Sequence, residues 1–240
     1  MTLADLLDSL VILRDQTATR TDQEEFRFLN FCLVNLMRSR SQLLQDLWVL
    51  YELNSPSGGY FVEIGACDGV HFSNSYLLET QFAWRGIAVE PSRFWYPGIH
   101  NNRSCAVDER CVWSESERTI MFNQASVPMH ATIDSYSTSD MHAKSREDGR
   151  RYPVQTVSLN DLLAQHGAPR RIDYLSLDTE GSELDILAAF DFEAWDVRLI
   201  TVEHNHTDRR DAIFDLLTSK GFRRKFDMIS RVDDWYVKDV

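Results

Sequence analysis

The stretch that decides the fold is Tyr60-Phe61-Val62-Glu63-Ile64-Gly65-Ala66-Cys67-Asp68-Gly69, an apolar run that closes on an acid and a glycine. A second apolar run, residues 86–90, ends on another acid, Glu90. In nucleotide-binding α/β domains the first glycine allows a sharp turn, the second lets the next element approach the ligand, and the acid after the second strand accepts hydrogen bonds from ribose hydroxyls. The interval from Gly69 to Glu90 fits the usual distance of about twenty residues. The stretch therefore predicts half of a nucleotide-binding α/β domain.

The spacing of the glycines favours one class of ligand. A dinucleotide dehydrogenase requires G-x-G-x-x-G, with a helix N-terminus that faces a pyrophosphate. This chain has G-x-x-x-G, with Cys67 in place of the middle glycine. Glu63 would repel a pyrophosphate and attract a cation. S-adenosylmethionine carries a sulfonium, an ammonium and a ribose but no phosphate, so the pattern favours this cofactor over NAD. A strand-to-helix turn without any ligand is the alternative reading.

Composition and charge exclude several classes of protein. The 240 residues are 43% hydrophobic, enough for one substantial packed domain with an appended segment. We divide the chain into an N-terminal helical cover, residues 1–55, and a main domain, residues 56–240. The net charge of −12 argues against a nucleic-acid partner, because the short basic clusters at 209–210 and 223–225 are typical of solvated faces.

The four cysteines have no C-x-x-C spacing, which favours a reducing compartment over a disulfide framework and does not suggest zinc. We find no signal peptide pattern and no apolar run of membrane-spanning length, so we expect a cytoplasmic protein without a membrane span.

The order of elements along the chain predicts a mostly parallel sheet with helices on both faces. Three helical apolar patterns come first, with leucines at helical spacing over 3–13, a capping box from Thr21 to Glu24, and a third pattern over 43–51. From residue 60 strands alternate with helices, and the chain ends in two extended runs, 222–226 and 235–237. Residues 124–152 are polar, and we expect them to be irregular.

Taken together, these segments resemble the FkbM-type family of S-adenosylmethionine-dependent methyltransferases. The similarity begins near residue 41 and rests on the order and spacing of five segments: 41–46 (SQLLQD), 59–69 (GYFVEIGACDG), 86–91 (GIAVEP), 156–162 (TVSLNDL) and 175–184 (LSLDTEGSEL). It implies a Rossmann-like class I methyltransferase sheet of seven strands, one of them antiparallel. It also implies methylation of a hydroxyl on a sugar, glycan, lipid or secondary metabolite, with S-adenosyl-L-methionine as the cofactor.

Within this resemblance we assign cofactor contacts to residues that follow the first strands. Glu63 would anchor the ammonium, Glu90 would bind the ribose diol and Pro91 would pack beside the adenine. The remaining assignments are Gly65, Ala66, Gly69, Ser73 and Asn74 for the methionine side and Cys111 and Val112 for the adenine edge. Ser73 and Asn74 have the alternative role of helix caps, and Cys111 and Val112 that of core residues.

The acceptor side is assigned to residues after the later strands. Asp178 ends a buried strand, where ligands meet open α/β sheets, and would touch cofactor and substrate or act as a base. Glu180 is assigned to the same region. The alternative is that its negative charge stabilises the N-terminus of the following helix through the helix dipole. His204 follows the next strand and is a second candidate base, with a structural role as the alternative. We assign no metal ligand. The alternative is that Asp178 and the cluster over 203–206 together bind a divalent cation.

Two other function classes stay open at this point. One is a non-catalytic interaction module on a methyltransferase scaffold, since a fold does not fix a function. The other is an NAD-dependent oxidoreductase, against which the glycine spacing argues. We expect a small-molecule or glycan acceptor as the partner, and the helices of the cover offer a surface for a homodimer.

Overall fold

The computed structural model describes residues 8, 11–12 and 24–239. The leucines of the predicted helix over 3–13 and the proposed cap Thr21 lie outside the described residues.

The predicted central sheet is confirmed. Its strands follow the order β10-β11-β9-β8-β1-β2-β3, and β11 runs antiparallel to both of its neighbours while the pairs β9-β8, β8-β1, β1-β2 and β2-β3 are parallel. The two C-terminal extended runs form the closing hairpin. The strands are β1 (Tyr60–Ile64), β2 (Arg85–Val89), β3 (Ala106–Asp108), β8 (Arg171–Leu177), β9 (Asp196–Glu203), β10 (Phe222–Lys225) and β11 (Asp233–Lys238).

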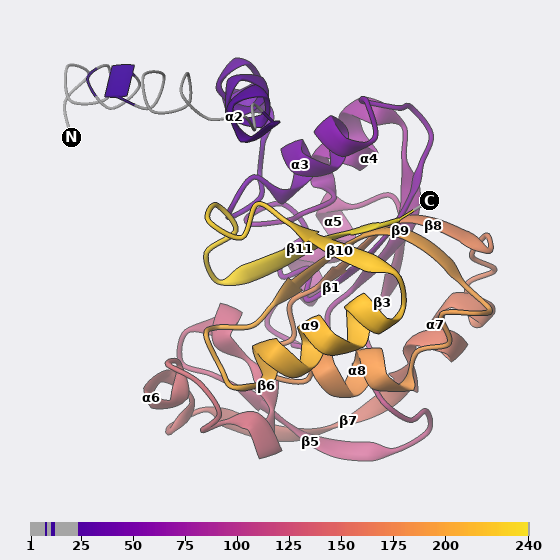
Figure 1. Ribbon diagram of the computed structural model, residues 1–240. Helices are drawn as coiled ribbons and strands as arrows, with labels where there is room; N and C mark the ends of the chain where they lie inside the picture. The colour runs from indigo at the N-terminus through magenta and orange to yellow at the C-terminus, as the bar shows by residue number, and fades with distance from the viewer. Residues whose placement is uncertain (1–7, 9–10, 13–23, 240) are drawn as a thin grey trace.

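Helices cover both faces of this sheet (Figure 1). One face carries α2 (Glu24–Asn35), α3 (Gln45–Glu52), α4 (Tyr76–Phe82) and α5 (Tyr96–Asn102). The other face carries α7 (Leu159–Gln165), α8 (Glu183–Ala189) and α9 (Arg209–Ser219). Ser158 caps α7, because its side chain accepts a hydrogen bond from the Asp161 amide.

The alternation of side chains along β1 explains why both faces are covered. Val62 and Ile64 pack into the core beneath α7, α8 and α9, whereas Phe61 packs into the core beneath α2, α3 and α4. Successive side chains of a strand point to opposite faces, so a strand that is apolar at nearly every position requires helices on both sides. The polar exception on β1 is Glu63, which is buried with only 2% of its surface exposed.

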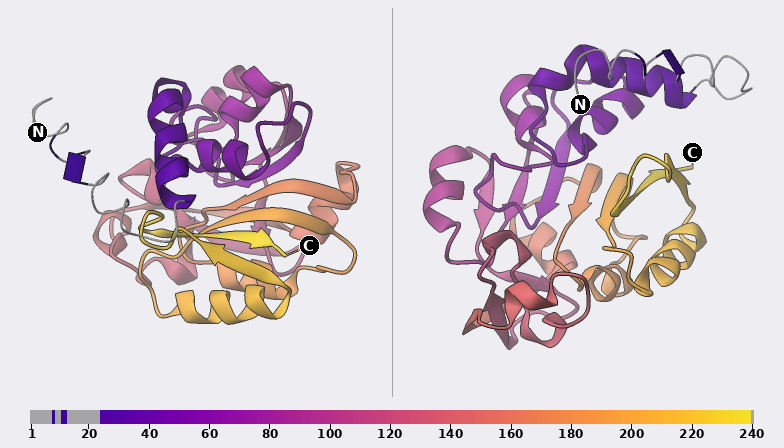
Figure 2. Two further views of the ribbon diagram at one scale, coloured as in Figure 1. Left: turned by 45° about the horizontal axis from the view of Figure 1, so that its top comes forward. Right: turned by 90° about the vertical axis from the view of Figure 1, so that its left-hand side faces the viewer.

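The segment that we expected to be irregular, 124–152, contains regular structure, so that expectation is wrong in part. A second sheet has the order β4-β7-β5-β6, made of β4 (Cys111–Trp113), β7 (Arg150–Ser158), β5 (Thr119–Gln124) and β6 (Thr132–Ile133). Between β5 and β7 lie short helices, namely η2 (Pro128–His130), η3 (Asp134–Tyr136) and α6 (Ala143–Arg146). We call the segment between β5 and β7, residues 125–149, the insert. Figures 1 and 2 show it on the side of the molecule away from α3 and α4.

The chain just before α3 runs along the loop that follows β1. Here η1 (Leu36–Arg38) precedes a parallel bridge between Ser41 and Phe72, and the Ser41 hydroxyl donates to the Ser73 carbonyl over 3.3 Å. The buried Asp46 carboxylate accepts from the Ser39 hydroxyl over 2.6 Å and from the Arg40 amide over 3.0 Å.

Within the described residues, no helix combines the length and the apolar character needed to cross a membrane.

Candidate functional site

A cavity of about 230 Å³ lies where the parallel strands end. Residues that follow β1, β2, β8 and β9 face it together, because the carboxyl ends of parallel strands meet at the same edge of a sheet. The insert also lines the cavity, through residues 128–131, 133 and 141–142. The predicted residues that line the cavity are Gly65, Glu90, Pro91, Cys111, Val112, Asp178 and Glu180.

The first glycine shapes the floor of the cavity. Gly65 has a φ of +89°, and a Cβ atom placed there would lie 1.9 Å from the Asp178 carbonyl oxygen. A side chain would therefore clash with this carbonyl oxygen. The positive φ also disfavours residues other than glycine at this position. The Gly65 and Ala66 amides both donate to the Val89 carbonyl, over 3.0 and 3.1 Å. The turn thus draws the ends of β1, β2 and β8 together.

Glu90 presents a carboxylate with spare acceptor capacity. One oxygen accepts from the Ser92 amide over 2.7 Å and the other from the Cys67 amide over 2.9 Å. Each carboxylate oxygen can accept a second bond, so both remain able to receive a diol. Burial raises the pKa of Glu90 to about 8, although the two amide bonds oppose the rise. A cationic ligand nearby would favour the ionised form.

Asp178, Glu180 and Glu203 form a cluster at the ends of β8 and β9, with carboxylate oxygens within 4.8 Å of one another. Burial, followed by the charge of Asp233, raises the pKa of Asp178 to about 7. Burial and the charge of Asp178 raise the pKa values of Glu180 and Glu203 well above their usual range. Arg146 offsets one of these charges by pairing with Glu180 at 2.7 Å, so the other carboxyl groups of the cluster retain a proton or attract a cation.

The predicted base His204 does not line the cavity. Its Nδ1 accepts the His206 amide over 3.0 Å, and its Nε2 lies 3.8 Å from an Asp234 oxygen. Burial lowers the pKa of His204 to about 4. This side chain is therefore directed away from the acceptor side, and its neighbours Glu203 and Asn205 face the cavity instead. The cluster of carboxylates does not include His204 or His206.

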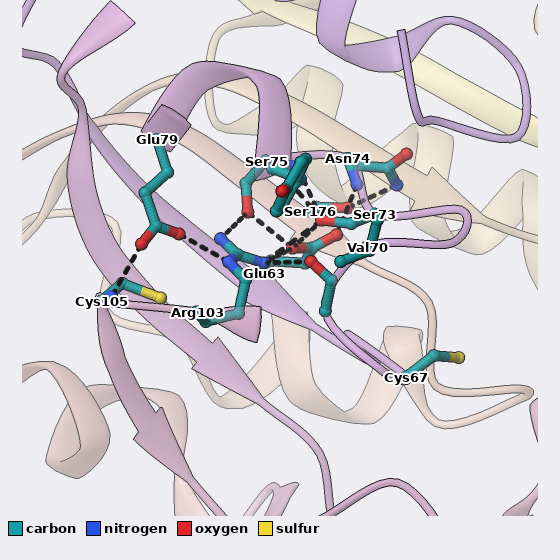
Figure 3. Close-up of polar contacts among 12 residues, drawn as sticks. Glu63, Cys67, Val70, Ser73, Asn74, Ser75, Glu79, Arg103, Cys105 and Ser176 are labelled. Atoms are coloured by element: carbon teal, nitrogen blue, oxygen red, sulfur yellow. Dashed lines mark hydrogen bonds and ion pairs between the residues drawn. The ribbon is translucent and has the colours of Figure 1, made fainter. Parts of the chain in front are cut away.

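Glu63 also lies outside the lining of the cavity, because protein groups occupy its carboxylate (Figure 3). It accepts from the Ser73 hydroxyl over 2.9 Å and from the Ser75 hydroxyl over 2.6 Å. The Asn74 amide donates to its second oxygen over 2.5 Å. Arg103, whose side chain is fully buried, supplies the balancing charge at 3.1 Å. Glu63 thus has a guanidinium partner inside the protein.

The other residues that we assigned to the methionine side of the cofactor lie outside the cavity and contact the chain around the glycine turn. Ser73 accepts from the Tyr76 amide at the start of α4, a contact that matches a capping role, whereas Asn74 donates to the Ser176 hydroxyl of β8. Gly69 has a φ of +81°, and a Cβ there would lie 2.6 Å from the Arg103 side chain. Ala66 is buried in a small cluster under α5. None of these four lines the cavity.

Several lining residues were missed from the sequence. Gln42, Phe72 and Trp95 line the cavity beside residues that we had predicted. Gln42 belongs to a segment that carried the resemblance, which was the available signal. His130 and His142 lie in the insert, where no periodicity or spacing marked them.

The donor set fits S-adenosylmethionine better than a phosphate-bearing cofactor. Among the described residues that line the cavity there is no lysine or arginine, whereas four carboxylic acids are present: Glu90, Asp178, Glu180 and Glu203. A pyrophosphate would find no cation here, while a sulfonium and an ammonium would find compensating charge. This observation argues against NAD.

Comparisons with known proteins point to one family of methyltransferases. The model of the FkbM methyltransferase domain matches residues 63–224. The methyltransferase sdnD of Sordaria araneosa is 26% identical over 199 residues, which cover 70% of this chain and 75% of that protein.

Two solved structures were also matched. The methyltransferase FkbM of Methylobacillus flagellatus KT has 16% identity and a TM-score of 0.48, with 98% of this chain covering 60% of that one. The precorrin-6y C5,15-methyltransferase of Geobacter metallireducens GS-15 has 13% identity and a TM-score of 0.43, with coverage of 75% and 71%. Since the domain model spans most of the chain and includes the ends of the four strands that face the cavity, this protein is a methyltransferase of the FkbM family.

Proposed function

We propose that the protein transfers the methyl group of S-adenosyl-L-methionine to a hydroxyl group of a small-molecule or glycan acceptor. The observation that carries the proposal is the placement of two carboxylic acids about one cavity. Glu90 and Asp178 follow β2 and β8, the two neighbours of β1, and the Gly65 turn lies between them. One acid is positioned to hold a ribose and the other to meet an acceptor.

On the cofactor side, Glu90 would accept the two ribose hydroxyls while its backbone partners fix the carboxylate. Pro91, Trp95, Cys111 and Val112 line the adjoining wall, where an adenine would pack. The bound cofactor supplies an activated methyl group on a sulfonium. The protein's part is to align the acceptor with that group and to exclude water.

On the acceptor side, Asp178 is the group best placed to take the hydroxyl proton. It is partly open to the cavity, and a pKa of about 7 matches a base that works near neutral pH. Glu203 belongs to the same cluster of carboxylates. After Asp178 has taken the proton of the acceptor hydroxyl, Glu203 would share that proton with it.

Calorimetry tests the cofactor assignment. We expect wild-type protein to bind S-adenosylmethionine and S-adenosylhomocysteine, and Glu90→Gln to weaken both by about tenfold or more, since hydrogen bonds to a charged group contribute about 1.5–3 kcal/mol. Glu193→Gln, an exposed carboxylate at a distance from the strand ends, is the control. Unchanged affinity in Glu90→Gln would remove the ribose assignment. Failure of the wild type to bind either compound would favour a non-catalytic module.

Turnover tests the base. With an acceptor from a library of hydroxyl compounds, we expect Asp178→Asn to lower kcat by about 10²–10⁴-fold. Formation of S-adenosylhomocysteine is the readout. Asp178→Asn with full turnover would assign the base elsewhere.

A further inference from the structure

One wall of the cavity is made by the insert. Its lining residues are Pro128, Met129, His130, Ala131, Ile133, Met141 and His142, which we call the insert wall. Met129 and Met141 are 39% and 61% exposed although they are apolar. Methionine side chains adapt to irregular apolar ligands, so two of them at the mouth of a cavity offer contact surface to an apolar body.

The polar groups of the insert wall carry no charge near neutral pH. The rings of His130 and His142 stack with centroids 3.8 Å apart, and His130 Nδ1 lies 3.0 Å from the Ser145 hydroxyl. Burial, then the neighbouring His142 and Arg146, lowers the pKa of His130 to about 4, and burial also lowers the pKa of His142. The pair therefore offers hydrogen bonds but no positive charge.

The cation that contacts the insert wall, Arg146, is already paired with carboxylates of the protein. Arg146 is fully buried behind the insert wall, where it pairs with Asp140 at 2.8 Å and with Glu180 at 2.7 Å. Its Nε donates to the His130 carbonyl over 2.7 Å. Arg146 thus fixes the insert wall against the cluster of carboxylates and is not free to meet a ligand. A negatively charged acceptor would find carboxyl groups and uncharged imidazoles.

We infer that the insert wall binds an uncharged alcohol with an apolar body, and that it rejects acceptors that carry a phosphate, a sulfate or a carboxylate near the reacting hydroxyl. The inference rests on the proposed function, which requires an acceptor at this end of the cavity. The apolar body packs on Met129, Met141 and Ile133, while its hydroxyl meets Asp178. Rejection of anions follows because a buried charge without a partner is costly, and the nearby carboxyl groups repel it.

Two probes with the same naphthalene ring system and different charge test this inference on the full chain. They are naphthalene-1-methanol and 1-naphthoate, titrated by naphthalene fluorescence with S-adenosylhomocysteine at saturation. We expect the alcohol to bind, and the carboxylate to bind about tenfold more weakly or worse, because like charges at close range cost several kcal/mol. Equal or tighter binding of the carboxylate overturns the inference.

A substitution at the mouth provides the second measurement. Met141→Lys places a cation beside the wall, and we expect it to narrow the preference for the alcohol over the carboxylate by about fivefold, the effect of a partly exposed ion pair. Met228→Lys is the matched control, because Met228 is 83% exposed and lies outside the cavity lining. An unchanged ratio in Met141→Lys, or a change of equal size in Met228→Lys, contradicts the inference.

The two proposals fail separately. If S-adenosylhomocysteine does not bind, the proposed function falls and this inference falls with it. If S-adenosylhomocysteine binds but naphthalene-1-methanol shows no binding at about 1 mM, only the acceptor class is overturned.

Discussion

Arg103 and Glu63 form a buried ion pair directly behind the glycine turn. The Arg103 Nη1 lies 3.1 Å from a Glu63 oxygen, and its Nε lies 2.5 Å from Glu79 on α4. The same guanidinium donates to the Ser73 and Ser75 hydroxyls over 3.2 and 2.8 Å (Figure 3). One cation therefore joins β1, the start of α4 and the chain leading into β3.

Loss of this cation should destabilise the fold strongly. We expect Arg103→Met to lower the free energy of unfolding by about 3–5 kcal/mol, because Glu63 would remain buried without its partner. The double variant Glu63→Gln/Arg103→Met should lose less, since it leaves no unpaired charge at Glu63. Urea unfolding followed by circular dichroism measures both. Arg118→Met is the control, because the Arg118–Glu115 pair is exposed and contributes less than about 1 kcal/mol. If Arg103→Met cost no more than Arg118→Met, the pair would have no structural importance.

Stability without a ligand should fall as the pH rises from about 6.5 to 8.5. Burial raises the pKa of Glu90 from its usual value of 4.5 to about 8, so the folded protein retains a proton that the unfolded chain has lost. Asp178 and Asp233, whose pKa values rise to about 7, act in the same direction. His130 and His204 are uncharged in the folded protein but about half protonated in the unfolded chain at pH 6.5, so they oppose the fall at the lower end of this window and stop contributing above about pH 7.5.

Urea midpoints across this range measure the effect, and Glu90→Gln should show a flatter dependence on pH because the amide has no proton to lose. A midpoint that is constant or rises over the window would contradict the raised pKa of Glu90.

The turn at Gly65 should tolerate no side chain. We expect Gly65→Ala to destabilise the protein by several kcal/mol, because the new methyl group would meet the Asp178 carbonyl in addition to the strain of a positive φ. Gly58→Ala is a matched control with a φ of +79° and no atom within 4 Å of the added Cβ, so it should cost only about 1–2 kcal/mol. Thermal unfolding compares the two. Equal losses would mean that the contact with Asp178 is unimportant.

The helices before β1 should unfold together with the rest of the chain, as expected for a cover and not for a separate domain. Trp48 is fully buried with its ring centroid 5.3 Å from that of Trp235, and Phe28 stacks on Phe226 at 4.9 Å. We expect Trp48→Ala to lower the free energy of unfolding by about 3–5 kcal/mol in a single transition. Val34→Ala, at a position 85% exposed on α2, should change it by less than about 0.5 kcal/mol. A separate early transition affected by Trp48→Ala alone would show two independent units.

The sequence by itself determined where the strands lie along the chain and which acids follow them. Apolar runs of strand length, the glycine turn after Ile64 and the acid Glu90 are local signals, because each depends on a few adjacent residues and on the geometry of parallel strands. They were sufficient to predict a mostly parallel sheet and the placement of Gly65, Glu90 and Asp178 at one cavity, while the number of seven strands came from the resemblance to the FkbM-type family.

Only the tertiary structure decided which polar side chains face that cavity. Glu63 is turned toward Arg103, forty positions along the chain, and His204 toward Asp234, while His130 and His142 enter from an insert that carried no pattern. The choice between a partner inside the protein and a ligand depends on charges and burial contributed by distant segments. No local spacing encodes that information, since a buried charge is paired by whichever group the packing brings within reach.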